Sequence, residues 1–112
     1  MIFHIATLTE WEHAPDTEPY QAASLPTEGF IHCSTREQIP AVASRFYHGR
    51  TDLVLIRINE AHLDVPLRFE NFEGGEERYP HIYGPIPRSA ITGILPFPPE
   101  EDGTFRFPET SA

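Results

Sequence analysis

The fold is decided by residues 29–49, GFIHCSTREQIPAVASRFYHG. The bulky run over residues 30–33 is typical of a short strand, because such side chains suit a pleated, half-buried segment. The run that follows predicts a helix, with Pro40 near its first position and Gly49 as its stop. Apolar residues recur at helical spacing and predict the buried face of that helix: Ile39, Val42, Ala43 and Phe46.

Polar side chains lie where this strand becomes the helix, and they predict an anion-binding site. A tight first turn over residues 35–38 is expected, capped either by Ser34 with Glu37 or by Thr35 with Gln38. The start of a helix presents unpaired N–H groups, which favour an anion. Arg36 lies in this turn, where it either helps to hold the anion or points into water. We therefore predict Ser34, Thr35 and Arg36 as ligand-binding residues.

The rest of the chain consists mainly of predicted strands. A short helix capped by Thr7 or Thr9 is expected to end at Pro15, and residues 16–26 predict a loop long enough to cover a site. A single helical turn is expected at residues 59–63, and a mobile, glycine-rich turn at residues 71–78. Strands are predicted at residues 2–6, 53–58, 67–70, 81–83, 90–97 and 104–107. The pattern predicts a single α+β domain over residues 1–112.

Composition excludes several classes of function. The chain has 112 residues, a formal net charge of −9, eight basic residues and one cysteine. This charge speaks against binding nucleic acids or anionic membranes, which require basic surfaces. All the basic residues are arginine, so Schiff-base chemistry on a lysine is excluded. The single cysteine, together with the lack of a secretory leader or a long apolar run, predicts a cytoplasmic protein.

Three histidines fall on predicted strands and are the candidate catalytic residues: His4, His32 and His81. Because side chains alternate along a strand, Ser34 is expected to share a face with His32, and Tyr83 with His81. If the strands are neighbours, these five side chains line one cleft. Imidazole is suited to acid–base work near neutral pH, although each histidine alone is also compatible with a half-buried structural role.

Several motifs resemble one bacterial family, named only as domain of unknown function 952. They are IFHIAT at residues 2–7, GFIHCST at 29–35, RFYHGRTDLVLI at 45–56 and PHIYGPIP at 80–87. The resemblance covers nearly the entire chain and is least distinct at residues 16–25 and in the last ten residues. It implies the ADP-ribosyltransferase fold, a split and mainly antiparallel sheet around a cleft for a nicotinamide dinucleotide.

The resemblance also implies roles for particular residues. Transferases of that fold carry a histidine or arginine on the first core strand, which His4 matches. They carry a tyrosine or serine on a strand leading into a helix, where this chain offers His32 and Ser34. Their glutamate on a later strand is replaced here by His81, and the nearest acids in sequence, at positions 76 and 77, lie in the glycine-rich turn. Because the glutamate steadies positive charge in the transition state, its replacement speaks against ordinary ADP-ribosyl transfer.

These observations leave three hypotheses for the function. The first is a transferase or hydrolase acting on a nucleotide-like or other small anionic molecule, for which a NAD-like dinucleotide is a candidate cofactor. In that case Tyr83 stacks on the ligand or hydrogen-bonds to it. The second is a non-catalytic small-molecule-binding or protein-interaction module with the same cleft. The third is a metal site formed by His4, His32 and His81, although their spacing matches no metal-binding motif. The oligomeric state stays open.

Overall fold

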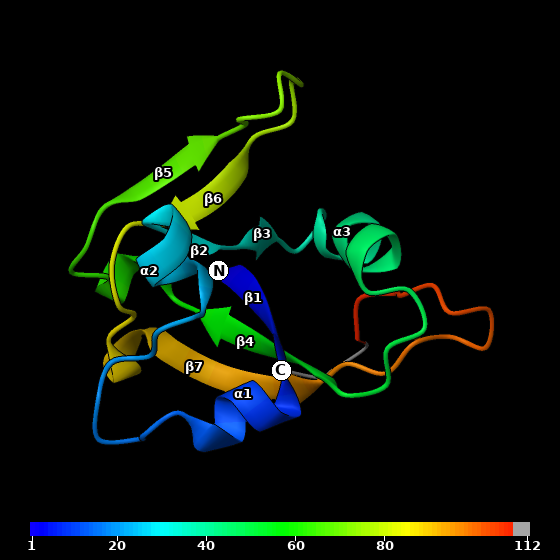
Figure 1. Cartoon of the computed structure of the whole chain (residues 1–112), viewed down its shortest axis with the longest axis horizontal. Coiled ribbons are helices and arrows are strands. Elements are labelled where there is room, and N and C mark those ends of the chain that lie inside the picture. Colours follow the sequence, from blue (N-terminus) through cyan, green and yellow to red (C-terminus); the bar gives the residue numbers. More distant parts are fainter. Residues whose placement is uncertain (109–112) are drawn as a thin grey trace.

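The computed structural model describes residues 1–108, which form two antiparallel sheets and a few short helices (Figure 1). The larger sheet has four strands in the order β3-β1-β4-β7, and the smaller has three in the order β2-β6-β5. The strands are β1 (Ile2–Thr7), β2 (Ile31–His32), β3 (Ser34–Thr35), β4 (Leu53–Ile58), β5 (Leu67–Glu70), β6 (Tyr79–Ile82) and β7 (Ile91–Pro96). The helices are α1 (Leu8–His13), α2 (Ser24–Glu28) and α3 (Ile39–Phe46), with 3-10 turns at Glu60–His62 and Arg88–Ala90. The predicted α+β class and the antiparallel pairing of the strands are confirmed.

The decisive stretch forms the predicted helix, but Phe46, expected on its buried face, is 61% exposed, and the strand before the helix also differs from the prediction. Helix α3 has Pro40 in its first turn, and Gly49 follows it with a left-handed φ of 79°. The second of the two expected capping boxes is present. The Thr35 N–H donates to Gln38 Oε1 at 3.0 Å, and the Gln38 N–H donates to Thr35 Oγ1 at 3.3 Å. The single strand expected at residues 30–33 is instead two short strands, because the chain crosses from the small sheet to the large one at Cys33.

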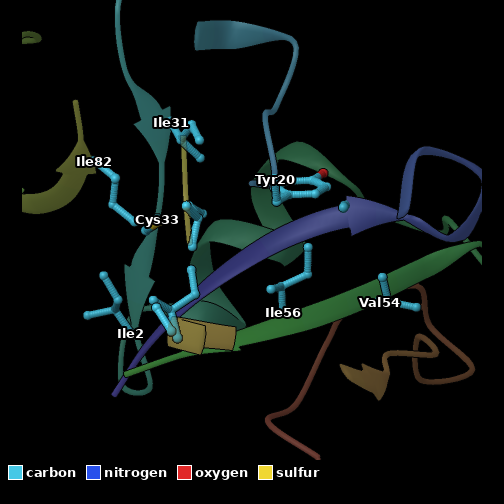
Figure 2. Close-up of a cluster of buried hydrophobic side chains, with 11 residues drawn as sticks. Ile2, Tyr20, Ile31, Cys33, Val54, Ile56 and Ile82 are labelled. Atoms are coloured by element: carbon cyan, nitrogen blue, oxygen red, sulfur yellow. The ribbon is translucent and has the colours of Figure 1, made fainter. Parts of the chain in front are cut away.

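The core has two parts, one on each face of the large sheet. One cluster lies between the sheets and joins apolar residues of β1 and β4 to those of β2 and β6 (Figure 2). Its buried members are Ile2, Ala6, Tyr20, Ile31, Cys33, Val54, Ile56, Ile58, Ile82, Ile86 and Ala90. The second cluster joins the opposite face of β1 and β4 to α3, through Phe3, Ile5, Ile39, Ala43, Leu53, Leu55, Phe97 and Phe105. Strands β1 and β4 are thus apolar on both faces because both faces are covered.

The segment predicted as a loop at residues 16–26 is folded onto the molecule. Tyr20 forms an isolated bridge with Ile86 and is 2% exposed, and α2 begins within the segment at Ser24. Arg88, in the 3-10 turn before β7, holds the segment by two hydrogen bonds. Its Nε donates to the Glu18 carbonyl at 2.7 Å and its Nη2 to the Pro15 carbonyl at 2.5 Å. The prediction of an irregular loop throughout was therefore wrong.

Two further strand predictions need correction. Strand β6 begins at Tyr79, earlier than the expected residue 81, and includes Pro80. The ring is tolerated because Pro80 needs no N–H there and its carbonyl accepts a 3.0 Å hydrogen bond from the Cys33 N–H. Residues 104–107 form no strand, since Phe105 packs against Phe97 with ring centroids 4.8 Å apart. Across residues 1–108, the helices are all too short or too polar to cross a membrane.

Candidate functional site

The outer face of the small sheet brings two of the predicted histidines together. His32 of β2 and His81 of β6 are directly opposite in the antiparallel register, and His81 is in turn opposite Arg68 of β5. Residues that are directly opposite point to the same face of a sheet. The two imidazole rings are accordingly 5.4 Å apart between centroids and nearly perpendicular, with an interplanar angle of 81°.

A carboxylate that the sequence reading missed orients His81. Glu70 at the end of β5 places Oε1 3.1 Å from His81 Nδ1, and the same oxygen accepts a 2.6 Å hydrogen bond from the Tyr83 hydroxyl. The hydrogen bond from Tyr83 lowers the pKa of Glu70, and the same bond raises the pKa of Tyr83. Because a carboxylate only accepts, the proton of the neutral His81 ring lies on Nδ1, which leaves the Nε2 lone pair free to accept a proton. The alternation of Leu67-Arg68-Phe69-Glu70 was the available signal for Glu70.

His32 has its own carboxylate partner, on the last residue of α2. Its Nε2 lies 3.2 and 3.1 Å from the two oxygens of Glu28. The side chains of this pair are about half exposed, at 54% for His32 and 50% for Glu28. His81, in contrast, is 5% exposed. The site therefore combines one buried, fixed imidazole with one accessible imidazole, each paired to a glutamate.

Two phenylalanines flank His81. The Phe30 ring stacks on the imidazole with centroids 4.3 Å apart and planes 25° apart. The Phe72 ring lies 5.5 Å away with planes 11° apart, and Phe72 is 67% exposed. An aromatic surface of this kind, next to ring nitrogens, suits a flat heterocyclic ligand.

His4 is separated from this face. It lies on β1 between Ile2 and Ala6, and it points with them into the core between the sheets, where it is 8% exposed. Its Nδ1 donates a 2.6 Å hydrogen bond to the backbone carbonyl of His32, so it contacts β2 from the core side. Burial lowers the pKa of His4 from its ordinary value of 6.5. The expectation of one cleft lined by three imidazoles was therefore wrong, because β1 belongs to the other sheet.

The three residues predicted to hold an anion are engaged in other contacts. Ser34 is buried in β3 opposite Phe3 of β1, and Thr35 uses its hydroxyl to cap the turn. The Arg36 guanidinium is exposed and lies over the Phe107 ring, 4.3 Å from its centroid. The role of these three residues as anion ligands stays a prediction.

The space between the sheets does not fit a dinucleotide, because the hydrophobic cluster fills it (Figure 2). Within residues 1–108, no three ligand-type side chains converge on a point where a metal ion would bind. The metal hypothesis therefore fails for the three histidines. Two surface hollows, of ≈ 380 and ≈ 420 Å³, lie along the segment from Glu10 to Ala23 and include Arg88 and Tyr20 in their walls. Neither is lined by His32 or His81.

Comparison with known proteins places this geometry in a family. The model of the family described as "Protein of unknown function (DUF952)" matches residues 5–94. The crystal structure of protein CC0527 from Caulobacter crescentus is similar, with 30% identity, a TM-score of 0.80, and coverage of 94% of this chain and 92% of that one. The solution NMR structure of the same protein has 30% identity, a TM-score of 0.79, and coverage of 94% and 90%. A comparison with curated proteins finds no match.

Proposed function

This chain belongs to the DUF952 family, and we propose that it binds a nucleotide-like anionic molecule on the outer face of its small sheet and catalyses hydrolysis or group transfer there. His81 is the general base and His32 the general acid. The observation that carries the proposal is the pairing of His81 Nδ1 with Glu70, 3.1 Å away, which leaves Nε2 as the proton acceptor of the neutral ring. A carboxylate that fixes the tautomer of a histidine in this way is typical of acid–base catalysts.

The proposed chemistry uses the two imidazoles in sequence. Nε2 of His81 takes the proton of a water or hydroxyl nucleophile as its oxygen attacks the substrate, and Glu70 stabilises the resulting imidazolium. The protonated ring of His32, held by Glu28, gives a proton to the leaving oxygen as its bond breaks. Proton transfers of this kind typically contribute 10²–10⁴-fold to a rate.

The surroundings supply binding groups for an anion with an aromatic base. The exposed ring of Phe72 provides a stacking surface beside His81. Arg68 is opposite His81 in the register and lies over the Tyr83 ring, 5.1 Å from its centroid. In a chain of formal charge −9, this arginine and the two imidazoles are the groups that would contact a phosphate, with the carboxylates of Glu28 and Glu70 beside them. NAD is one ligand to test, and no step of the proposal depends on it.

A second candidate is a binding module without turnover. The side chain of His32 is 54% exposed and Phe72 is 67% exposed, so the site is open to water. Catalytic sites commonly exclude water, whereas binding surfaces need not. This openness is the observation that favours the second candidate.

The experiment compares ligand binding with product formation. We expect AMP, ADP-ribose or NAD to raise the melting temperature of the wild type, since a ligand at a hundred times its Kd adds about 2.7 kcal/mol of stability. His81→Asn and Glu70→Gln should abolish the shift or reduce it strongly, whereas His13→Asn, an exposed histidine on α1, should not.

Chromatography of the same mixtures then separates the two candidates. A product that disappears in His81→Asn supports catalysis, and binding without a product supports the module. The absence of a shift with every one of these ligands, and of any product, would contradict both.

A further inference from the structure

The outer strands of the small sheet are β2 and β5, and within residues 1–108 β5 pairs with β6 alone (Figure 1). The Tyr83 N–H donates to the Pro66 carbonyl at 2.8 Å, so residues at even positions of β5 exchange backbone hydrogen bonds with β6. Successive residues of a strand direct their backbone groups to opposite sides. The N–H and C=O groups of Leu67 and Phe69 therefore point away from β6, toward the position that a further strand would occupy.

Strand β5 is a short edge with two charged residues, Arg68 and Glu70, so it should pair only with a strand of complementary charge. One outer strand of the large sheet, β7, carries Pro96 and an irregular register near its first residues. Such features protect an edge from association. Strand β5 has a regular register with β6 over its four residues, and Phe69 at its centre is 47% exposed. An exposed aromatic residue on a regular, unpaired strand is typical of a surface that pairs.

The charge pattern of β5 is complementary to that of a second copy of the same strand. If two copies of β5 run antiparallel about a two-fold axis at Phe69, each Arg68 is opposite Glu70 of the other copy. Phe69 then forms a hydrogen-bonded pair with its own symmetry mate. Leu67 and Asn71 pair in the same way, and the two Arg68–Glu70 pairs are non-hydrogen-bonded pairs, in which side chains lie closest. Opposite charges in directly opposite positions stabilise a sheet. We propose that β5 is a homodimerisation edge, which joins two small sheets into one six-stranded sheet.

The dimer would bring an extra cation to the candidate site. Arg68 and Glu70 point to the face that carries His81, and Glu70 Oε1 already contacts His81 and Tyr83. Arg68 of the second copy would approach Glu70 from the open edge, where this carboxylate is 23% exposed. Four residues on each side make a small interface, and small interfaces give weak, concentration-dependent association. The inference is independent of the proposed function, because it rests on the edge and its charges.

Sedimentation velocity from micromolar to millimolar protein tests the dimer. We expect reversible dimerisation by the wild type. Phe69→Pro removes an outward N–H and the exposed ring without removing a hydrogen bond to β6, and should weaken the dimer by about tenfold or more. Arg68→Glu creates two like-charge pairs and should weaken it similarly, whereas the double variant Arg68→Glu/Glu70→Arg restores complementary pairs and should recover it. Phe46→Ala removes another exposed phenylalanine, on α3, and should leave the dimer intact.

The register is tested by NMR on a mixture of labelled and unlabelled chains. An intermolecular contact between the Hα protons of Arg68 and Glu70 is expected, because these protons meet in a non-hydrogen-bonded antiparallel pair. A monomer at millimolar concentration would overturn the proposal. A dimer that survives both Phe69→Pro and Arg68→Glu would also overturn it, because such a dimer uses another surface.

Discussion

Tyr83 and Glu70 are joined by a 2.6 Å hydrogen bond, in which the phenol donates to the same carboxylate oxygen that contacts His81. Glu70 ends β5 and Tyr83 follows β6, so the bond spans two neighbouring strands. It leaves the second oxygen of Glu70 without either of these partners. Tyr83 therefore helps to fix the carboxylate that orients the His81 ring, although its hydroxyl bonds to Glu70 and not to the ring itself.

Removal of the Tyr83 hydroxyl should raise the pKa of Glu70 toward its ordinary value of 4.5, because that hydrogen bond is the main cause of its lowering. Carbon-detected NMR titration of Tyr83→Phe measures the pKa directly. Tyr79→Phe, on the same strand, is the matched control and should leave it unchanged. An unchanged Glu70 pKa in Tyr83→Phe would show that the phenol does not stabilise the carboxylate.

The buried His4 should make the protein less stable as pH falls below 6.5. Burial lowers its pKa in the folded state, so between that lowered value and 6.5 the unfolded chain binds more protons than the folded one. Stability therefore falls as pH is lowered through this window, by at most about 1.4 kcal/mol per pH unit. The titration of Glu70 affects stability only at lower pH, since its ordinary pKa is 4.5 and is lowered in the folded state.

Urea unfolding at a series of pH values measures this dependence. His4→Gln removes the titrating ring, so the slope between pH 5 and 6.5 should decrease in this variant. His13→Gln changes an exposed histidine and should retain the wild-type slope. Equal slopes for the wild type and His4→Gln would mean that His4 is protonated in the folded protein without loss of stability, which would contradict the prediction.

Arg88 should hold the segment around Tyr20 against the core. Its guanidinium bonds the carbonyls of Pro15 and Glu18 and lies over Trp11, 4.9 Å from the ring centroid. We expect Arg88→Ala to destabilise the protein by about 1–3 kcal/mol, because two hydrogen bonds from a charged group are lost. The fluorescence of Trp11, the only tryptophan, should change, and the Tyr20 amide should exchange faster. Arg45→Ala on α3 is the control, and protection of Tyr20 that survives in Arg88→Ala would contradict the role.

Gly84 should resist any side chain because Val65 lies against it. A Cβ at position 84 would lie 2.6 Å from Val65 Cγ1 and 2.9 Å from Val65 Cβ. Gly84→Ala is therefore expected to cost about 1–3 kcal/mol, as for other overpacked sites. Val65→Ala should recover part of this loss when combined with it. Chemical denaturation of the two single variants and the double variant measures the coupling, and strictly additive effects would contradict direct contact.

Much of this geometry follows from local sequence pattern. Alternation along a strand correctly placed Tyr83 with His81, and capping chemistry correctly placed the turn between Thr35 and Gln38. Both are decided by residues a few positions apart. The absence of a strand at residues 104–107 was not predictable in this way, because the aromatic residues there are held by distant rings such as Phe97.

Long-range pairing decided what the sequence could not show. β5 and β6 are consecutive strands joined by the glycine-rich turn, but the length of that turn leaves their register open, and the register is what makes Glu70 the partner of His81. The same limit applies to His4, whose strand joined the other sheet and whose ring was buried as a result. Glu28 was missed because the helix that carries it lay partly in a segment read as irregular.

The crossing of the chain at Cys33 has a mechanical consequence. Ile31 and His32 are bonded into one sheet and Ser34 and Thr35 into the other, with one residue between them. A hinge needs a few residues that absorb large backbone rotations, and a single buried residue gives little such freedom. The two sheets should thus behave as one stiff frame, and adaptation to a visiting molecule would fall to side chains and peripheral turns.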